Sequence, residues 1–167
     1  SFLPVPIVWL LSIAGAFIFG AAWAFIPAYL QAKRGSHIVI TTIMFNFIAS
    51  SLMVYLLVDV IRDMKQMGPH TVALPKELWL PSFKDLAALF GIKIRYSPLN
   101  ASFLLAIAAS FFVWFLVWKT KWGYEMRAVG HNTQAAIYAG ISPYKNIIIA
   151  MLISGGLAGL LSINEVM

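Results

Sequence analysis

The run IVWLLSIAGAFIFGAAWAFIPAYL, Ile7 to Leu30, decides the fold class because about 24 consecutive residues carry no charge. A helix rises 1.5 Å per residue, so this run would extend about 36 Å. That length is sufficient to cross the hydrocarbon core of a bilayer with some tilt. The run therefore predicts a membrane-spanning helix.

Three further apolar runs have a similar character. They do not alternate apolar and polar residues as the strands of a membrane β-barrel do, so helices are the expected spanning elements. We predict an all-α, polytopic transmembrane helix bundle that forms one domain over residues 1–167, and we interpret it as part of a longer membrane protein. The four predicted spans are residues 7–30, 38–58, 101–118 and 147–167.

The composition agrees with a membrane protein. Hydrophobic residues make up 61% of the chain and charged residues only 11%, whereas soluble domains carry about a quarter charged residues. The net charge of +6 fits basic loops held near anionic lipid at the cytoplasmic surface better than nucleic-acid binding. Membrane lipid is therefore an expected partner and nucleic acid is not.

No catalytic motif accompanies these runs. The sequence has no cysteine, no phosphate-binding G-x-x-x-x-G-K-[ST] loop, no H-E-x-x-H pair and no G-x-S-x-G elbow. These observations exclude thiolate chemistry and give no sign of ATP hydrolysis by this chain. We expect neither an enzyme nor a resident cofactor.

The connections between runs predict the topology. The short basic turn 31–37 follows Pro27, which should kink the first helix or begin its exit, and it fits a cytoplasmic position. By alternation, loop 59–100 is extracytoplasmic and loop 119–146 is cytoplasmic.

Small residues at every fourth position of the first run should pack closely inside the bundle against another helix, and Gly155 and Gly159 of the last run have the same spacing. The small residues of the first run are Ser12, Ala16, Gly20, Ala24 and Ala28.

The segment WGYEMRAVGHNTQAAIYAGISPYKN, Trp122 to Asn146, is polar and punctuated by glycine. Lys119 and Lys121 should end the third helix. Asn132 or Thr133 can cap a new short helix, Gly140 can end it, and Pro143 suits the first position of the next helix.

This short helix has two interpretations that the residues leave open. Ala135, Ala136 and Ala139 share a face without bulk, which could lie in a groove of another protein while Glu125 and Arg127 pair across the contact. Alternatively, the helix is a capped loop that packs on its own bundle.

A family resemblance rests on this segment. Its pattern R-A-x-G-x-N-x-x-A-A-x-x-x-G-I is similar to the cytoplasmic loop of ATP-binding-cassette (ABC) importer permeases of the branched-chain amino acid and simple-sugar superfamily. The stretch GAAWAFIPAYLQAKRGSHIVITTIMFNFIA, residues 20–49, resembles the subgroup that imports nucleosides and simple sugars. The matching residues of the loop are Arg127, Ala128, Gly130, Asn132, Ala135, Ala136, Gly140 and Ile141.

The resemblance implies a permease subunit in the bacterial cytoplasmic (inner) membrane. Its implied partners are a second permease subunit, an ABC ATPase subunit that uses the ATP, and an extracytoplasmic substrate-binding protein. Residues 132–140 match the coupling helix that docks on the ATPase, and Gly130 and Gly140 would let the backbone turn at its two ends. The residues assigned to coupling are Glu125, Arg127, Gly130, Asn132, Ala135, Ala136, Ala139 and Gly140.

The resemblance also directs attention to the polar residues of the second span, Thr41, Thr42 and Asn46. An asparagine within hydrocarbon needs a polar partner or water. These residues either bond to a neighbouring helix or line the translocation pathway, and both interpretations stay open.

Functions of other classes are also considered. An ion-coupled secondary carrier is the alternative, but such carriers usually place charges inside the membrane, and these spans carry almost none. A membrane scaffold or an intramembrane enzyme is a third interpretation.

Overall fold

The computed structural model describes residues 5–60 and 102–166, and all regular structure in these residues is helical. Four long helices and two short ones confirm the predicted all-α, polytopic class. In chain order the elements are α1 (Val5–Arg34), α2 (Ile38–Tyr55), a π-helical turn η1 (Leu56–Val60), α4 (Ser102–Lys119), α5 (Lys121–His131), α6 (Thr133–Tyr138) and α7 (Pro143–Val166).

The long helices are apolar and long enough to cross a membrane, over Ile7–Arg34, Ile38–Val60, Ser102–Lys119 and Pro143–Ile163. The first span does not end near Pro27, which lies inside α1 with the helix continuing to Arg34. The fourth begins at Pro143, the residue predicted to open that helix. Of the predicted loop 59–100, Asp59 and Val60 are helical, and residues 61–101 lie outside the described residues.

Small residues bring α1 and α7 into backbone contact. A Cβ atom added to Gly20 would lie 2.9 Å from the Gly159 Cα and would collide with the Gly155 carbonyl oxygen. A Cβ on Gly159 would likewise collide with the Ala16 carbonyl oxygen, and one on Gly155 with the Ala24 side chain. The predicted role of these small residues, close packing inside the bundle, is therefore confirmed, and we call this contact the α1–α7 seam.

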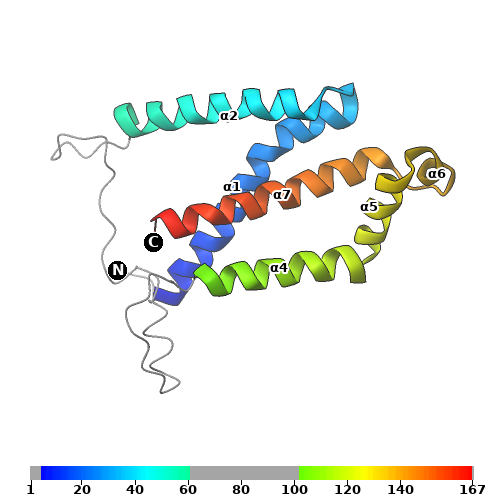
Figure 1. Cartoon of the computed structure of the whole chain (residues 1–167). Helices are drawn as coiled ribbons and strands as arrows, with labels where there is room; N and C mark the ends of the chain where they lie inside the picture. The colour runs from blue at the N-terminus through cyan, green and yellow to red at the C-terminus, as the bar shows by residue number, and fades with distance from the viewer. Residues whose placement is uncertain (1–4, 61–101, 167) are drawn as a thin grey trace, which may run out of the picture.

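By contrast, α2 makes few contacts with the other described helices. Among the described residues, α2 touches only α1 and its own continuation η1, and none of its residues is buried. Figure 1 shows α2 running apart from α4 and α7. The rings of Trp23 and Phe45 meet edge to face, with centroids 6.0 Å apart. Most of the α2 surface is thus free to meet lipid, water or protein.

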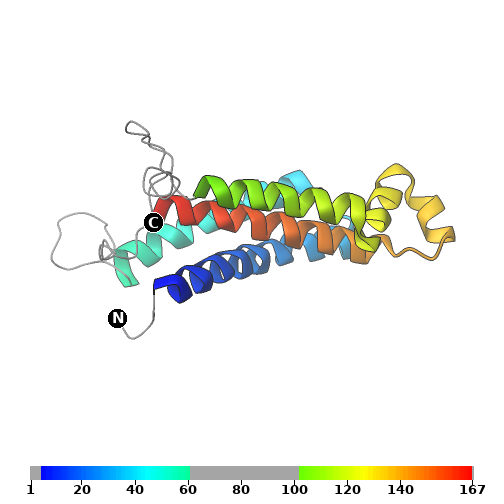
Figure 2. The same cartoon turned by 90° about the horizontal axis from the view of Figure 1, so that it is seen from below.

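Both predicted cytoplasmic connections lie at the same end of the long helices (Figure 1). Gly35 closes the α1–α2 turn with φ +62°, and its N–H donates to the Gln31 carbonyl oxygen at 3.0 Å. At this end α5 and α6 project beyond the long helices (Figure 2). The shared end is what the predicted alternation requires, and its cytoplasmic position stays a prediction.

Candidate functional site

The break between α4 and α5 is built by Thr120. Its hydroxyl donates to the Leu116 carbonyl oxygen at 2.6 Å and accepts from the Gly123 N–H at 3.2 Å, which caps α5. Gly123 is buried against the carbonyl groups of Leu116 and Val117, where a Cβ would collide with backbone. The chain therefore leaves the long helix α4 through a tightly packed corner.

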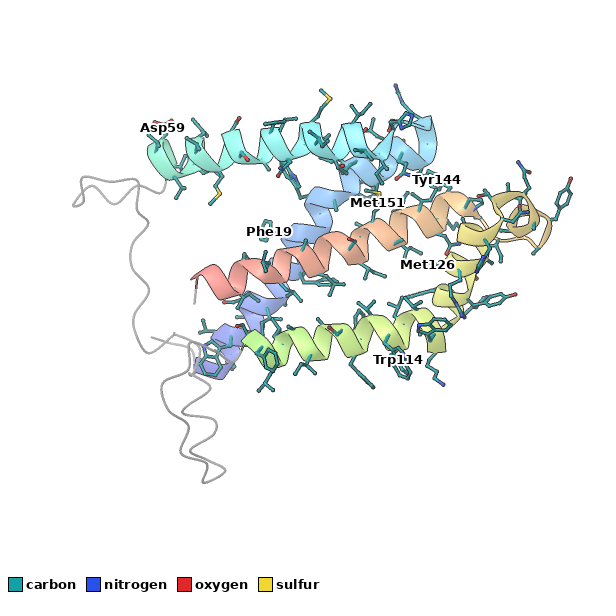
Figure 3. The ribbon with its side chains drawn as sticks, in the orientation of Figure 1. Phe19, Asp59, Trp114, Met126, Tyr144 and Met151 are labelled. Carbon is teal, nitrogen blue, oxygen red and sulfur yellow. The ribbon has the colours of Figure 1, made fainter. Side chains whose placement is uncertain are left out.

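Sequence reasoning missed α5. Lys119 ends α4 as predicted, but Lys121 opens α5 and does not belong to the end of α4. The sequence nevertheless contained a signal for α5. Thr120 is a residue type that caps helices, and the apolar residues Trp122, Met126 and Val129 follow it at helical spacing. Figure 3 shows Met126 directed from α5 toward the space between α4 and α7.

The second short helix, α6, was predicted correctly at both ends. The Asn132 side chain accepts from the Ala135 N–H at 3.1 Å, so Asn132 is the cap. Gly140 has φ +76°, and its N–H donates to the Ile137 carbonyl oxygen at 2.9 Å. The Ile141 N–H closes the end of the helix on the Ala136 carbonyl oxygen, also at 2.9 Å.

The prediction that Gly130 turns the backbone is wrong. Gly130 lies within α5 in ordinary helical conformation, and only Gly35 and Gly140 have positive φ in the described part of the chain. Asn132 makes the turn instead, with extended φ −155° and ψ 104°. A single extended residue can redirect the chain here because its side chain replaces the lost helical hydrogen bond.

The predicted alanine face is only partly exposed. Ala136 is only 3% exposed, so this side of α6 faces the rest of the chain, although Ala135 and Ala139 remain exposed. The large side chains next to Ala136 point outward: Ile137 is exposed, and Tyr138 is 92% exposed. The packing of α6 on its neighbours decides which side is hidden, and helical spacing alone does not contain that information.

Glu125 and Arg127 have partners within the chain. The Asn146 Nδ2 donates to Glu125 Oε2 at 3.5 Å, and Lys121 Nζ lies 3.9 Å from Glu125 Oε1. The Arg127 guanidinium lies over the Trp118 ring, 4.5 Å from its centroid. Glu125 and Arg127 thus contact α7 and α4 within this chain, and their pairing across a contact with another protein stays a prediction.

Asn146 is a functional candidate that sequence reasoning missed. It lies in the first turn of α7, is 3% exposed, and is the buried polar residue of the described core. Its Nδ2 also donates to the Ser142 carbonyl oxygen at 3.0 Å, while its Oδ1 is buried without a hydrogen-bond partner among the described residues. The only sequence signal was a single amide next to a long apolar run.

The predicted pathway residues on α2 separate into two kinds. The Thr41 hydroxyl lies 3.1 Å from the His37 carbonyl oxygen and 3.4 Å from Ser36 Oγ, so Thr41 serves the start of the helix. Thr42 and Asn46 are exposed and share a face one turn apart. The Thr42 hydroxyl donates to the Ile38 carbonyl oxygen at 2.8 Å, but Asn46 makes no hydrogen bond within the described part of the chain.

The described residues contain no group of three histidine, aspartate or glutamate side chains that could hold a metal ion. On α2, the exposed residues Thr42 and Asn46 form a polar stripe on a mostly apolar helix.

Comparison with known proteins identifies the family. The family model described as "Branched-chain amino acid transport system / permease component" matches residues 2–166. No solved structure matches the chain.

Three curated relatives are described as ABC transporter permeases. The chain is 38% identical over 143 residues to the guanosine ABC transporter permease NupP of Bacillus subtilis, a match covering 84% of this chain and 38% of that protein. It is 34% identical over 152 residues to the nucleoside ABC transporter permease NupB of Lactococcus lactis, covering 86% and 39%. It is 30% identical over 151 residues to a glucose ABC transporter permease of Haloferax volcanii, covering 90% and 40%.

The chain thus spans about two fifths of the length of the curated relatives it matches. The family match, in contrast, covers nearly the whole chain, and it agrees with the four apolar helices and with the residues of the 127–141 pattern. This chain is a multi-pass membrane protein that belongs to the permease-component family of the branched-chain amino acid transport system.

Proposed function

We propose that this chain is part of the membrane-spanning permease subunit of an ABC importer that carries a nucleoside or a simple sugar. The family match and the names of the relatives support this class of cargo. The spans agree with it, because they offer an uncharged cargo a route with very few charged side chains. ATP hydrolysis belongs to a separate ATPase subunit, and a substrate-binding protein and a second permease subunit complete the importer.

The observation that carries the proposal is α6, a helix fixed at both ends and displayed beyond the membrane-length helices (Figure 2). Residues 132–140 form the coupling element that docks on the ATPase. Ala136 packs α6 onto its own chain, so Ile137 and Tyr138 supply the docking contacts. An exposed tyrosine at a tip suits this role because aromatic anchors carry much of the affinity of protein interfaces.

The end that bears α6 faces the cytoplasm in this proposal, and the membrane is the bacterial cytoplasmic membrane. The α1–α2 turn and the α4–α7 connection gather basic residues at this end, as expected for cytoplasmic loops near anionic lipid. These basic residues are Lys33, Arg34, Lys119, Lys121, Arg127 and Lys145.

Thr42 and Asn46 line the translocation pathway in this proposal. An exposed amide on an apolar helix would be costly against lipid. Water in a transport route satisfies it without binding cargo tightly. A hydrogen bond to another helix of the complete subunit is the competing account. Thr41 is half-buried, so the exposed Thr42 and Asn46 are the stronger candidates.

Reconstitution of the full-length subunit with its ATPase and binding protein in vesicles tests the function. We expect ATP-dependent uptake of a nucleoside or a simple sugar. Uptake that follows an ion gradient and ignores ATP would establish an ion-coupled carrier and overturn the proposal.

Tyr138→Ala tests the docking contact. We expect it to weaken binding of the ATPase about ten-fold or more, as loss of an interface anchor does. The matched control is Tyr124→Ala, which removes an exposed tyrosine from α5, away from the tip. Equal ATPase binding by both variants would exclude Tyr138 as an anchor.

A further inference from the structure

The helix before the proposed coupling element, α5, contacts two membrane-length helices, α4 and α7. Among the described residues α5 contacts α4, α6 and α7. Its polar side chains Glu125 and Arg127 make contacts to α7 and α4 respectively. α5 is therefore placed to carry a displacement of α6 into the membrane.

The contact between α5 and α7 includes a side-chain hydrogen bond at an almost fully buried position. Asn146 donates to the Glu125 carboxylate from a site that is 3% exposed. The distance between Asn146 Nδ2 and Glu125 Oε2 is 3.5 Å, so the hydrogen bond is long, and low exposure limits competition from water for it. The neighbouring Lys121–Glu125 pair is a poor substitute, since Lys121 is 86% exposed and such pairs contribute little.

Packing alone does not explain an asparagine here. Its Oδ1 is buried without a partner among the described residues, and such an atom is unfavourable for stability. Leucine branches at the same carbon, Cγ, and would leave no polar atom unpaired. The Asn146 Nδ2 donates to the Ser142 carbonyl oxygen just before α7 and to Glu125, and the bond to Glu125 is the one that joins α7 to α5.

The helix contacts on either side of the Glu125–Asn146 hydrogen bond are also close. At the α4–α5 corner, Gly123 lies against the carbonyl groups of Leu116 and Val117, so the corner cannot bend freely. A single residue, Asn132, separates α5 from α6. On the far side, α7 meets α1 backbone to backbone along the α1–α7 seam.

We propose that the Glu125–Asn146 hydrogen bond makes α5, α6 and the start of α7 move as one unit, with Asn146 as the positioning residue that passes displacement of α6 to α7 and onward to α1. This inference rests on the proposed function, because it assigns the internal route by which the ATPase drives the membrane helices. It replaces the expectation that Glu125 contacts the ATPase directly.

Three substitutions in the reconstituted full-length importer test the route. Asn146→Leu should lower the cargo transported per ATP hydrolysed by about ten-fold, within the usual range of coupling between sites. ATPase binding and thermal stability of the complex should stay unchanged. Glu125→Gln keeps an oxygen that accepts from Asn146 and should retain most coupling, and Lys121→Ala should be indistinguishable from wild type.

A cross-link gives a second measurement. The 167 residues contain no cysteine, so Glu125→Cys combined with Asn146→Cys can be bridged by a short bifunctional thiol reagent once any other cysteines of the complex are replaced. We expect the bridged importer to retain uptake, because the two positions move together. Each single-cysteine variant treated with the same reagent is the control.

The outcomes separate the two proposals. If wild type transports with ATP but Asn146→Leu keeps normal coupling, or if the bridge abolishes uptake, the route through Asn146 is overturned while the proposed function stands. If Asn146→Leu instead loses stability and coupling together, Asn146 is a packing residue and the route is also overturned. If wild type shows no ATP-dependent uptake, the proposed function fails and the route fails with it.

Discussion

Single residues set the direction of the chain at the projecting end. Asn132 and Gly140 bracket α6, one by a side-chain cap and the other by a left-handed backbone conformation. Gly130, only two residues before Asn132, is plain helix. Two glycines in one short segment thus have different physical roles, which their identity alone does not distinguish.

Gly140→Val should disturb the end of α6. A side chain at φ +76° costs about 1–2 kcal/mol, and more for a β-branched residue. We expect uptake to fall relative to ATP hydrolysis while the protein still inserts in the membrane, as measured by transport and by membrane fractionation.

The matched control is Gly130→Ala. Gly130 is helical, and no atom outside its own helix lies within 4 Å of the position of a Cβ, so alanine should be neutral or slightly stabilising. Equal loss of uptake in both variants would contradict the role of the left-handed conformation.

At the scale of elements, the sequence contained most of the fold and less of the site. Long uncharged runs determine the four membrane-length helices, because a helix satisfies its own backbone in lipid and the runs lack the alternation of barrel strands. The break at Thr120 was missed although Thr120 can cap a helix, while the close packing of Gly123 against the preceding turn is visible only in the structure. The outward side of α6 and the bond of Asn146 to Glu125 were also missed, since both depend on contacts between separate elements.

The α1–α7 seam gives a sharp prediction at this scale. Gly20→Val should prevent the two helices from meeting, because its side chain would collide with the backbone of Gly155 and Gly159. We expect a large drop in folded protein recovered in mild detergent, as measured by size-exclusion chromatography.

Gly15→Ala on the same helix is the control. No atom outside the helix lies within 4 Å of its Cβ position, so recovery should match wild type. Normal recovery of Gly20→Val would mean that the seam can open without loss of the fold.

At the scale of the whole molecule, the described helices divide into a packed part and an open part. α1, α4, α5 and α7 contact one another directly or through a shared neighbour, while α2 stands apart with its polar stripe uncovered (Figure 1). Since this chain covers about two fifths of its relatives' length, further helices of the complete subunit have room to pack on α2.

Water access to α2 tests its proposed pathway role. In the full-length importer without other reactive cysteines, Asn46→Cys should react with a membrane-impermeant thiol reagent and be protected by cargo. Phe47→Cys, whose side chain leaves α2 about 100° away, should react slowly, because the proposed pathway role of Asn46 turns that side of α2 toward lipid. Slow reaction at both positions would favour a hydrogen bond to a neighbouring helix.

The brevity of α6 has a practical consequence. A helix of six residues does not persist in water by itself, because isolated helices shorter than about 12 residues are marginal. Its shape is maintained by Asn132, Gly140 and the packing of Ala136. A free peptide copying residues 130–141 would therefore be unfolded and a weak competitor for the ATPase, whereas a cyclic peptide that holds the same turn would lose less entropy on binding and make a better inhibitor.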